Sequence, residues 1–237
     1  ITADGTGGCV AIWRDNFTLL AQRLSPDGVP LWTANGLSLN EEPAHNLEGP
    51  TLHLAPDGNY LLTYFDNRPR PGGGLNQFWL VAEKISGTGE HLWGANGIDA
   101  ILEITSAHSV PDGEGGLIVF GQNRFNLDGT GQNIHRPKGF TFQRVLANQT
   151  LAWAQEVTLE VDVPTTAQYN YTSDGNGGII LAYIDSSDAL RAVRVTKDGT
   201  LAWTVEESLI SDSGVVIGEK PVVANDESGG AFVAWVS

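Results

Sequence analysis

The sequence is short of cysteine, methionine and basic residues: it has one Cys, no Met, and 13 Lys and Arg among 237 residues. The single cysteine, Cys9, cannot form an internal disulfide, which excludes the disulfide framework of small secreted domains. The 28 acidic residues give a formal charge of −15, which would repel a phosphate backbone. We therefore exclude nucleic acid as a partner. The lack of Met indicates a processed product or a segment of a longer protein.

Long apolar runs and catalytic signatures are missing as well. No run approaches the ~18 residues of a membrane-spanning helix, so we expect a soluble chain without a membrane span. Helical periodicity is scarce, which excludes a helical solenoid. HExxH, GxSxG, phosphate-loop and multi-cysteine motifs are also absent. We therefore assign no catalytic residue, expect no enzyme activity, and expect neither a metal nor a cofactor.

What the sequence does contain is a repeat. An Asp is followed by a Gly-rich turn and then by an apolar strand that ends in an aromatic residue. The copies are DGTGGCVAIW from Asp4, DGNYLLTY from Asp57, DGEGGLIVF from Asp112, DGNGGIILAY from Asp174 and DESGGAFVAW from Asp226. Tight turns between apolar strands predict β-hairpins.

A second signature follows the first four copies, and it consists of a strand, a tight turn and a strand at a tryptophan. The tryptophans are Trp32, Trp93, Trp153 and Trp203, and each is preceded by a basic residue that we expect to face solvent: Arg23, Lys84, Arg144 and Arg194. Each unit thus predicts four short strands, which is one propeller blade. We expect the repeated aromatic residues to be buried between blades: Trp13, Trp32, Tyr64, Trp93, Phe120, Trp153, Tyr183, Trp203 and Trp235.

Two of these turns carry a resemblance to a known motif. Ser25-Pro-Asp-Gly-Val-Pro-Leu-Trp32 and Thr196-Lys-Asp-Gly-Thr-Leu-Ala-Trp203 resemble Asp-box hairpins, and the whole unit is similar to propeller-like repeats of secreted bacterial surface proteins. The turns at 86–88 and 146–148 depart from the motif, so we expect them to keep the hairpin and lose the Asp-mediated hydrogen bonds. The resemblance implies an extracellular or cell-surface location.

We therefore predict an all-β fold: a β-propeller of about five four-stranded blades, four nearly complete and the last a C-terminal half blade. The prediction is one domain over residues 1–237. Its repeats are 1–43, 44–104, 105–163, 164–213 and 214–237.

Three residues are candidates for the axial channel. Counting four residues back from the Asp of each copy places His53, His108, Asn170 and Val222 at one position, whose neighbours of the same parity are mostly polar. We expect this polar side to border the channel and His53 and His108 to lie on adjacent strands. Two histidines without a third ligand make a poor metal site, so we interpret them as bonding backbone or water.

Two long loops, 67–77 and 123–139, are the candidate ligand-binding surface. They hold five of the 13 basic residues. The candidates are Arg68, Arg70, Arg124, His135, Arg136 and Lys138. Because both loops leave the same strand end, we expect them side by side as a positive patch suited to acidic glycans, or as charges that only pair with local acids.

Glycosylation sequons begin at Asn16, Asn148 and Asn170. We expect Asn16 and Asn148 in loops, as candidate acceptors, and Asn170 on an inner strand where a glycan would not fit.

These observations predict an extracellular structural or interaction module, such as a segment of a surface fibre, sheath or adhesin. Its partners would be other surface proteins or another copy of the chain, added at the strand edge after Val236. The alternative is a carbohydrate-binding or carbohydrate-processing propeller that uses the basic loops.

Overall fold

The computed structural model describes residues 1–16, 18–39, 48–67, 78–123, 139–164, 166–203, 209–211 and 219–236. In these ranges the regular secondary structure consists only of β-strands. They are arranged as four four-stranded antiparallel sheets and one two-stranded sheet. No helix in this part of the chain is long and apolar enough to cross a membrane. The prediction of an all-β chain made of four-stranded sheets is confirmed.

Each sheet is built from strands that are consecutive in the sequence. The first contains β1 (Thr2–Ala3), β2 (Cys9–Asp15), β3 (Thr18–Leu24) and β4 (Leu37–Ser38). The second contains β5 (Glu48–Leu54), β6 (Tyr60–Asp66), β7 (Trp79–Ile85) and β8 (Ile98–Leu102). The third contains β9 (His108–Pro111), β10 (Leu117–Gln122), β11 (Gly139–Val145) and β12 (Val157–Glu160). The fourth contains β13 (Tyr169–Ser173), β14 (Ile179–Ile184), β15 (Leu190–Val195) and β16 (Leu209–Ser211), and the last contains β17 (Val222–Asn225) and β18 (Ala231–Ala234).

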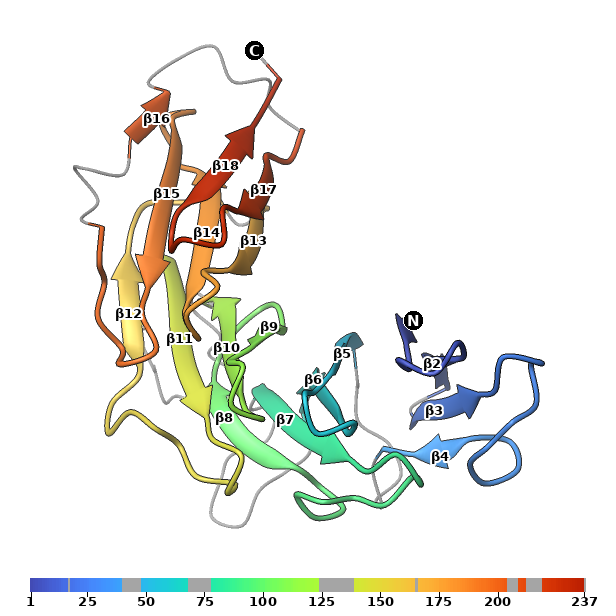
Figure 1. Ribbon diagram of the computed structural model, residues 1–237. Helices are drawn as coiled ribbons and strands as arrows, with labels where there is room; N and C mark the ends of the chain where they lie inside the picture. Colours follow the sequence, from blue (N-terminus) through green and yellow to red (C-terminus); the bar gives the residue numbers. More distant parts are fainter. Residues whose placement is uncertain are drawn as a thin grey trace.

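The sheets follow one another in chain order along a curved row (Figure 1). The first strands of neighbouring sheets contact one another: β1 with β5, β5 with β9, β9 with β13 and β13 with β17. They lie on the concave side of the row, which is the arrangement of a β-propeller, whose blades present their first strands to the axis. Side chains that project from these strands can therefore reach both the concave side and the next sheet.

A separate apolar core fills each space between neighbouring sheets. The buried aromatic residues confirm the blade register at six of the predicted positions: Trp32, Tyr64, Trp93, Phe120, Trp153 and Tyr183. The prediction is wrong for Trp13 and Trp235, which are 38% and 40% exposed, and Trp203 is only partly buried. Trp13 and Trp235 belong to the first and last sheets, each of which has a neighbouring sheet on one side only among the described residues.

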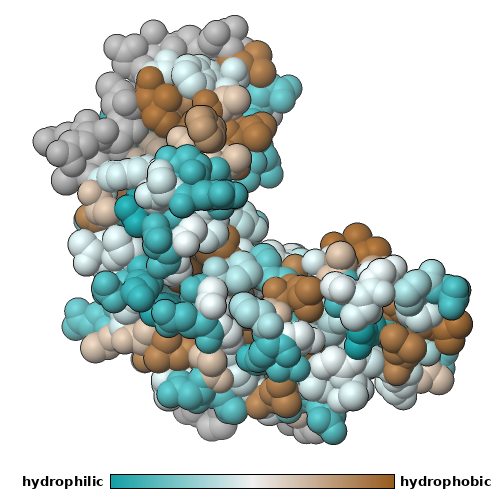
Figure 2. All heavy atoms as spheres, in the orientation of Figure 1, coloured by the Kyte–Doolittle hydropathy of each residue, from teal (hydrophilic) through white to brown (hydrophobic). Residues whose placement is uncertain are grey.

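The last sheet exposes several large apolar side chains. Figure 2 shows apolar side chains gathered at the end of the row formed by β17 and β18. The exposed large apolar residues in and directly after this sheet are Val222, Phe232, Trp235 and Val236.

The repeated Asp residues organise the hairpins. In the third sheet, one Asp112 carboxylate oxygen accepts the backbone N–H groups of Glu114 and Gly116, both at 2.8 Å. The other oxygen accepts Arg144 from β11 at 2.9–3.0 Å. Asp4 with Arg23, Asp57 with Lys84, and Asp174 with Arg194 form the same pair. The expectation that these basic residues face solvent is therefore wrong, because each neutralises a carboxylate at a turn.

The repeated tryptophans join one sheet to the next. The indole N–H of Trp32 donates to the carbonyl of Gly87 at 3.1 Å, and that of Trp153 donates to Lys197 at 3.1 Å. The accepting carbonyls lie in the hairpin turns of the next sheet. The hairpins at Ser86 and Leu146 are closed by backbone bonds to Glu90 and Thr150, both at 2.9 Å, as predicted.

Candidate functional site

The predicted basic surface cannot be placed. Its candidates, Arg68, Arg70, Arg124, His135, Arg136 and Lys138, all lie outside the described residues, as does most of the two loops. The site is therefore built from the described part of the concave side.

The two channel histidines do not share a site. The turn after β5 is closed by Ala55 N–H to Asn59, whereas the turn after β9 is closed by Asp112 N–H to Gly116. The Asp57 turn thus starts two residues earlier relative to its Asp, so His53 pairs with Leu61 at a position two residues further along the strand than His108, which pairs with Phe120. Alignment on the Asp alone shifted the register in this sheet.

His53 contributes to a buried contact between the second and third sheets. Its Nε2 lies 3.0 Å from Ser109 Oγ, and Ser109 also contacts Thr51 at 2.7 Å and Thr63 at 3.2 Å. Burial lowers the pKa of His53. A Ser–His pair at this distance is the geometry of an activated nucleophile, but Ser109 is 0% exposed, so no substrate reaches its hydroxyl. The pair joins two sheets.

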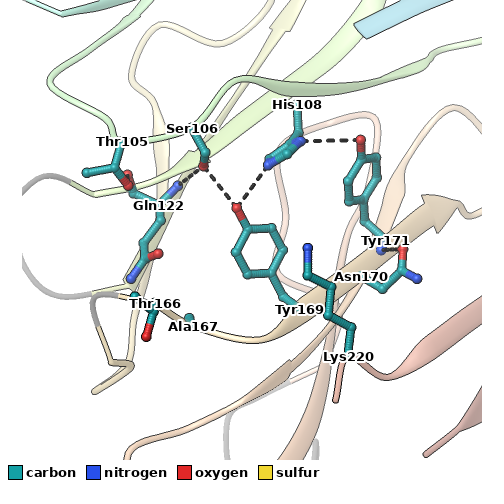
Figure 3. Close-up of a pocket in the computed structure, with 10 residues that line it drawn as sticks. All are labelled: Thr105, Ser106, His108, Gln122, Thr166, Ala167, Tyr169, Asn170, Tyr171 and Lys220. Atoms are coloured by element: carbon teal, nitrogen blue, oxygen red, sulfur yellow. Dashed lines mark hydrogen bonds between the residues drawn. The ribbon is translucent and has the colours of Figure 1, made fainter. Parts of the chain in front are cut away.

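His108 lies in an open pocket instead. A cavity of about 440 Å³ lies between the start of β9 and the start of β13, with one side formed by the segment that leads into β17 (Figure 3). Its lining is rich in hydroxyl and amide groups: Thr105, Ser106, His108, Gln122, Thr166, Ala167, Tyr169, Asn170, Tyr171 and Lys220. The pocket size suits a small polar molecule.

A chain of hydrogen bonds runs through this pocket. Tyr169 Oη lies 3.0 Å from Ser106 Oγ on one side and 2.9 Å from His108 Nε2 on the other (Figure 3). On the far side of the imidazole, Tyr171 Oη lies 3.4 Å from Nδ1. A phenol thus bridges a serine hydroxyl and an imidazole, and a second phenol fixes the orientation of the ring.

The environment keeps the imidazole neutral. The ring of His108 packs against Phe120 with centroids 5.2 Å apart and against Tyr171 with centroids 5.1 Å apart. Burial, with a smaller contribution from the positive charge of Lys220, lowers the pKa of His108 to about 4. At neutral pH the imidazole is therefore uncharged and has one nitrogen able to accept a proton.

The phenols stay protonated. Burial raises the pKa of Tyr171 to about 12 and also raises the pKa of Tyr169. Both hydroxyl groups are therefore available as donors at neutral pH. The backbone N–H of Gln122 donates to Ser106 Oγ at 3.2 Å, so the serine oxygen faces donors from both the β10 backbone and Tyr169.

Asn170 and Lys220 form the rest of the wall. Asn170 lies on inner strand β13, as predicted, and its Oδ1 accepts the backbone N–H of Tyr171 at 2.8 Å. Lys220 precedes β17 and is exposed. Within the described ranges there is no group of three or more His, Cys, Asp or Glu side chains able to hold a metal ion.

Sequence reasoning identified His108 and Asn170 but missed the groups that act on the imidazole. Alternation along the strand places Tyr169 and Tyr171 on the side opposite to Asn170, and Ser106 and Lys220 are two of the polar residues that share the parity of the aligned position. The sequence did contain a signal. The first strand of the fourth sheet begins with Tyr-Asn-Tyr, and the first strand of the third sheet begins with His. Two phenols on one side of β13 face the preceding sheet, where His108 lies.

The loop sequons are on the surface. Asn16 and Asn148 are both exposed in turns, at φ 52° for Asn16. Asn148 Oδ1 accepts the Thr150 hydroxyl at 2.7 Å. Glycan attachment at these two residues stays a prediction.

Comparison with known proteins gives only distant likenesses. No protein-family model matches the sequence, and no curated protein matches it. One similar structure is provisionally described as a 6-phosphogluconolactonase from Bacteroides fragilis; it has a TM-score of 0.49 and 13% identity, and the match covers 99% of this chain and 62% of that one. Another is provisionally described as a gluconolactonase, with a TM-score of 0.44 and 14% identity over 98% of this chain and 82% of that one. The chain thus spans about 62% of the length of the first protein.

These findings correct the sequence-based view of function. The predictions of a non-catalytic surface module, such as a fibre or adhesin segment, and of no enzyme activity are wrong, because the similar structures carry the names of lactone-hydrolysing enzymes. At such low similarity the names assign no activity to this chain. The activity has to be argued from the pocket itself.

Proposed function

We propose that the chain is a hydrolase of small, hydroxylated esters, including their cyclic form, the lactones, and that Ser106, Tyr169 and His108 carry the reaction. The observation that carries this proposal is the continuous hydrogen-bonded chain from Ser106 Oγ through Tyr169 Oη to His108 Nε2, with spacings of 3.0 and 2.9 Å in an open pocket. Ester hydrolysis needs a nucleophile, a base and a group that orients the base, and Ser106, His108 and Tyr171 are placed for these three roles.

Each of the three hydrogen-bonded residues has a distinct role in the reaction. His108 is the base, because it is neutral at neutral pH and its ring is held by Tyr171. Tyr169 passes the proton: its hydroxyl donates to Ser106 Oγ in the structure, and rotation of this O–H toward His108 Nε2, 2.9 Å away, leaves the phenol oxygen able to accept from the serine. Ser106 is the nucleophile, and the N–H of Gln122 at 3.2 Å favours negative charge on its oxygen.

The reaction then runs in two balanced halves. The Ser106 hydroxyl proton moves to Tyr169 as the Tyr169 proton moves to His108, and the serine oxygen adds to the carbonyl carbon. The alkoxy C–O bond breaks, and the proton returns from His108 to the departing oxygen. Water repeats these steps on the acyl-serine, which releases the acid and restores the hydroxyl.

The lining favours a hydroxylated substrate over an apolar one. Thr105, Thr166 and Asn170 present hydroxyl and amide groups to the same space, and Ala167 is the only aliphatic side chain among the described residues that line it. A substrate with several hydroxyl groups would replace the water that these groups otherwise bind.

We also propose that the five sheets are successive blades of one propeller domain covering residues 1–237, with the last as a half blade. The repeat of the Asp turn, the basic residue and the tryptophan in successive sheets supports this division.

The test is hydrolysis of p-nitrophenyl acetate and glucono-δ-lactone by the purified chain, with spontaneous hydrolysis subtracted. We expect His108→Gln and Ser106→Ala to lower kcat/KM by about 100-fold or more. His53→Gln and Ser228→Ala are the matched controls, and each should retain wild-type activity. Equal rates in wild type and His108→Gln, with both proteins folded by circular dichroism, would refute the proposal.

A further inference from the structure

The pocket contains one charged side chain. Among the described residues that line it, Lys220 alone carries a formal charge at neutral pH, since His108 is neutral there. The sequence as a whole carries a charge of −15, so an anion is repelled by most of the surface. The ammonium group of Lys220 is therefore the favoured binding position for an anionic group in this pocket.

Lys220 is placed to serve this wall. It precedes Pro221, which is buried and restricts the backbone of the residue before it, so the start of the side chain is fixed beside β13. Figure 3 shows the side chain extending between Tyr169 and Tyr171 with its nitrogen toward His108. The electrostatic effect of Lys220 on His108 agrees with that placement.

The ammonium group is not used by the fold. Within the described part of the chain, it forms neither a hydrogen bond nor an ion pair, whereas the other described lysines do: Lys84 is 2.6 Å from Asp57, and Lys197 is 3.4 Å from Glu114. An ammonium has three N–H donors. Those of Lys220 are free to bind a ligand at the edge of the pocket.

We propose that Lys220 is a subsite for a carboxylate group, and therefore that the pocket holds the polyhydroxylated carboxylic acid that hydrolysis of the corresponding ester or lactone releases. This inference rests on the proposed function, and it names the substrate class of the same pocket. A carboxylate is favoured over a phosphate because one cation neutralises one charge. Phosphate sites usually supply further N–H groups or guanidinium groups, and no arginine lines this pocket among the described residues.

The substrate class can be tested with a pair of ligands that differ in one group. Gluconate and sorbitol have the same carbon chain and the same run of hydroxyl groups, and only gluconate carries a carboxylate. We expect gluconate to bind at least about 10-fold more tightly than sorbitol in calorimetric titrations at low salt, since only its carboxylate can form a charge-assisted hydrogen bond with the ammonium group. The difference should shrink as salt is added.

Three variants assign this preference to Lys220. Lys220→Met should remove the difference between gluconate and sorbitol, and Lys220→Arg should retain most of it. Lys197→Met is the matched control: it removes the same charge from an exposed lysine of the fourth sheet, so the preference should remain. Equal binding of gluconate and sorbitol by wild type, or an unchanged preference in Lys220→Met, would overturn the proposal. Tighter binding of inorganic phosphate than of gluconate would overturn the choice of carboxylate.

A second readout separates this subsite from catalysis. A carboxylate bound at Lys220 offsets the positive charge that lowers the pKa of His108, so gluconate should raise the pH at which the His108 imidazole NMR signals titrate, and sorbitol should not. His108→Gln should still bind gluconate while losing hydrolysis. Hydrolysis that is present, together with unchanged product inhibition by gluconate in Lys220→Met, would defeat the subsite alone. Lys220-dependent gluconate binding without any hydrolysis would defeat the proposed function alone.

Discussion

Arg144 and Asp112 form a buried ion pair in which two guanidinium nitrogens share one carboxylate oxygen at 2.9 and 3.0 Å. Their side chains are 8% and 1% exposed. A third nitrogen of Arg144 donates to the carbonyl of Lys197 in the next sheet at 3.4 Å. The same guanidinium therefore neutralises the turn of its own sheet and contacts the turn of its neighbour, which links local hairpin structure to the packing of sheets.

Removing this arginine should destabilise the protein strongly. Arg144→Met leaves the buried Asp112 carboxylate without its cation, and breaking one side of a buried pair costs about 3–5 kcal/mol. We expect a loss of at least about 3 kcal/mol in the free energy of unfolding, measured by urea denaturation. Lys197→Met is the comparison, because its pair with Glu114 is exposed on both sides, and we expect a change within about 0.5 kcal/mol. Similar losses in the two variants would show that Arg144 does not hold the sheets together.

The repeated aromatic residues should contribute unequally to stability, although the repeat predicts that all of them are buried. Trp93 is 3% exposed and donates its indole N–H to Ala147 at 3.3 Å, whereas Trp13 is 38% exposed. Trp93→Ala should cost about 3–5 kcal/mol and Trp13→Ala about 1–2 kcal/mol. Trp93→Phe retains most of the packing and should cost about 1 kcal/mol for the lost hydrogen bond. Thermal unfolding of the three variants checks the ranking, and a Trp93→Ala change below about 1 kcal/mol would contradict the blade packing.

Two glycines of one turn should be destabilised to different extents by an added methyl group. A Cβ on Gly116 would lie 2.2 Å from the carbonyl oxygen of Val145, on the backbone of β11. Gly113 has φ of +75° but nothing within 4 Å of its Cβ position. We expect Gly116→Ala to cost more than about 3 kcal/mol or to abolish folding, and Gly113→Ala to cost about 1–2 kcal/mol, the strain of a left-handed residue. Stability measurements that rank Gly113→Ala as the worse variant would contradict the described turn.

The repeat allowed much of the fold to be predicted. The Asp turns, the aromatic residues and the tryptophans gave the sheet class and the strand order, because each depends on local contacts within a unit. The burial of the basic residues was missed, because alternation along a strand cannot show that the Asp112 turn folds back over Arg144. The exposure of Trp13 and Trp235 depends on neighbouring sheets, which the repeat alone does not define.

The candidate site was predicted less completely than the fold. His108 and Asn170 were found by position on first strands, but the register of His53 was shifted because the Asp57 turn starts two residues earlier relative to its Asp than the Asp112 turn does. The contact of Tyr169 with His108 joins residues 61 positions apart in the sequence. No spacing rule gives such a contact, because it depends on how two sheets pack.

The pH dependence of stability should report on His108. Its pKa is about 4 when folded and near 6.5 when unfolded, so the unfolded chain binds the extra proton between these values. The stability linked to this group is therefore complete above about pH 6.5 and is lost as the pH falls toward 4, by about 3 kcal/mol in total. We expect His108→Gln to lack this component, so its free energy of unfolding should fall less than that of wild type between pH 6.5 and 4. Parallel pH profiles for the two proteins would contradict a buried, neutral His108.

The most direct test of the account is whether Ser106 becomes acylated in a way that needs His108. The chain is mixed rapidly with p-nitrophenyl acetate and quenched in acid, and its peptides are analysed by mass spectrometry. The account predicts an acetyl group on the peptide that contains Ser106 in wild type and about 100-fold slower formation of this acetyl group in His108→Gln. The corresponding peptide of Ser106→Ala should carry no acetyl group. Formation should slow as the pH falls toward 4, because protonation removes the base. Hydrolysis without acetylation of Ser106, or acetylation at the same rate in His108→Gln, would contradict it.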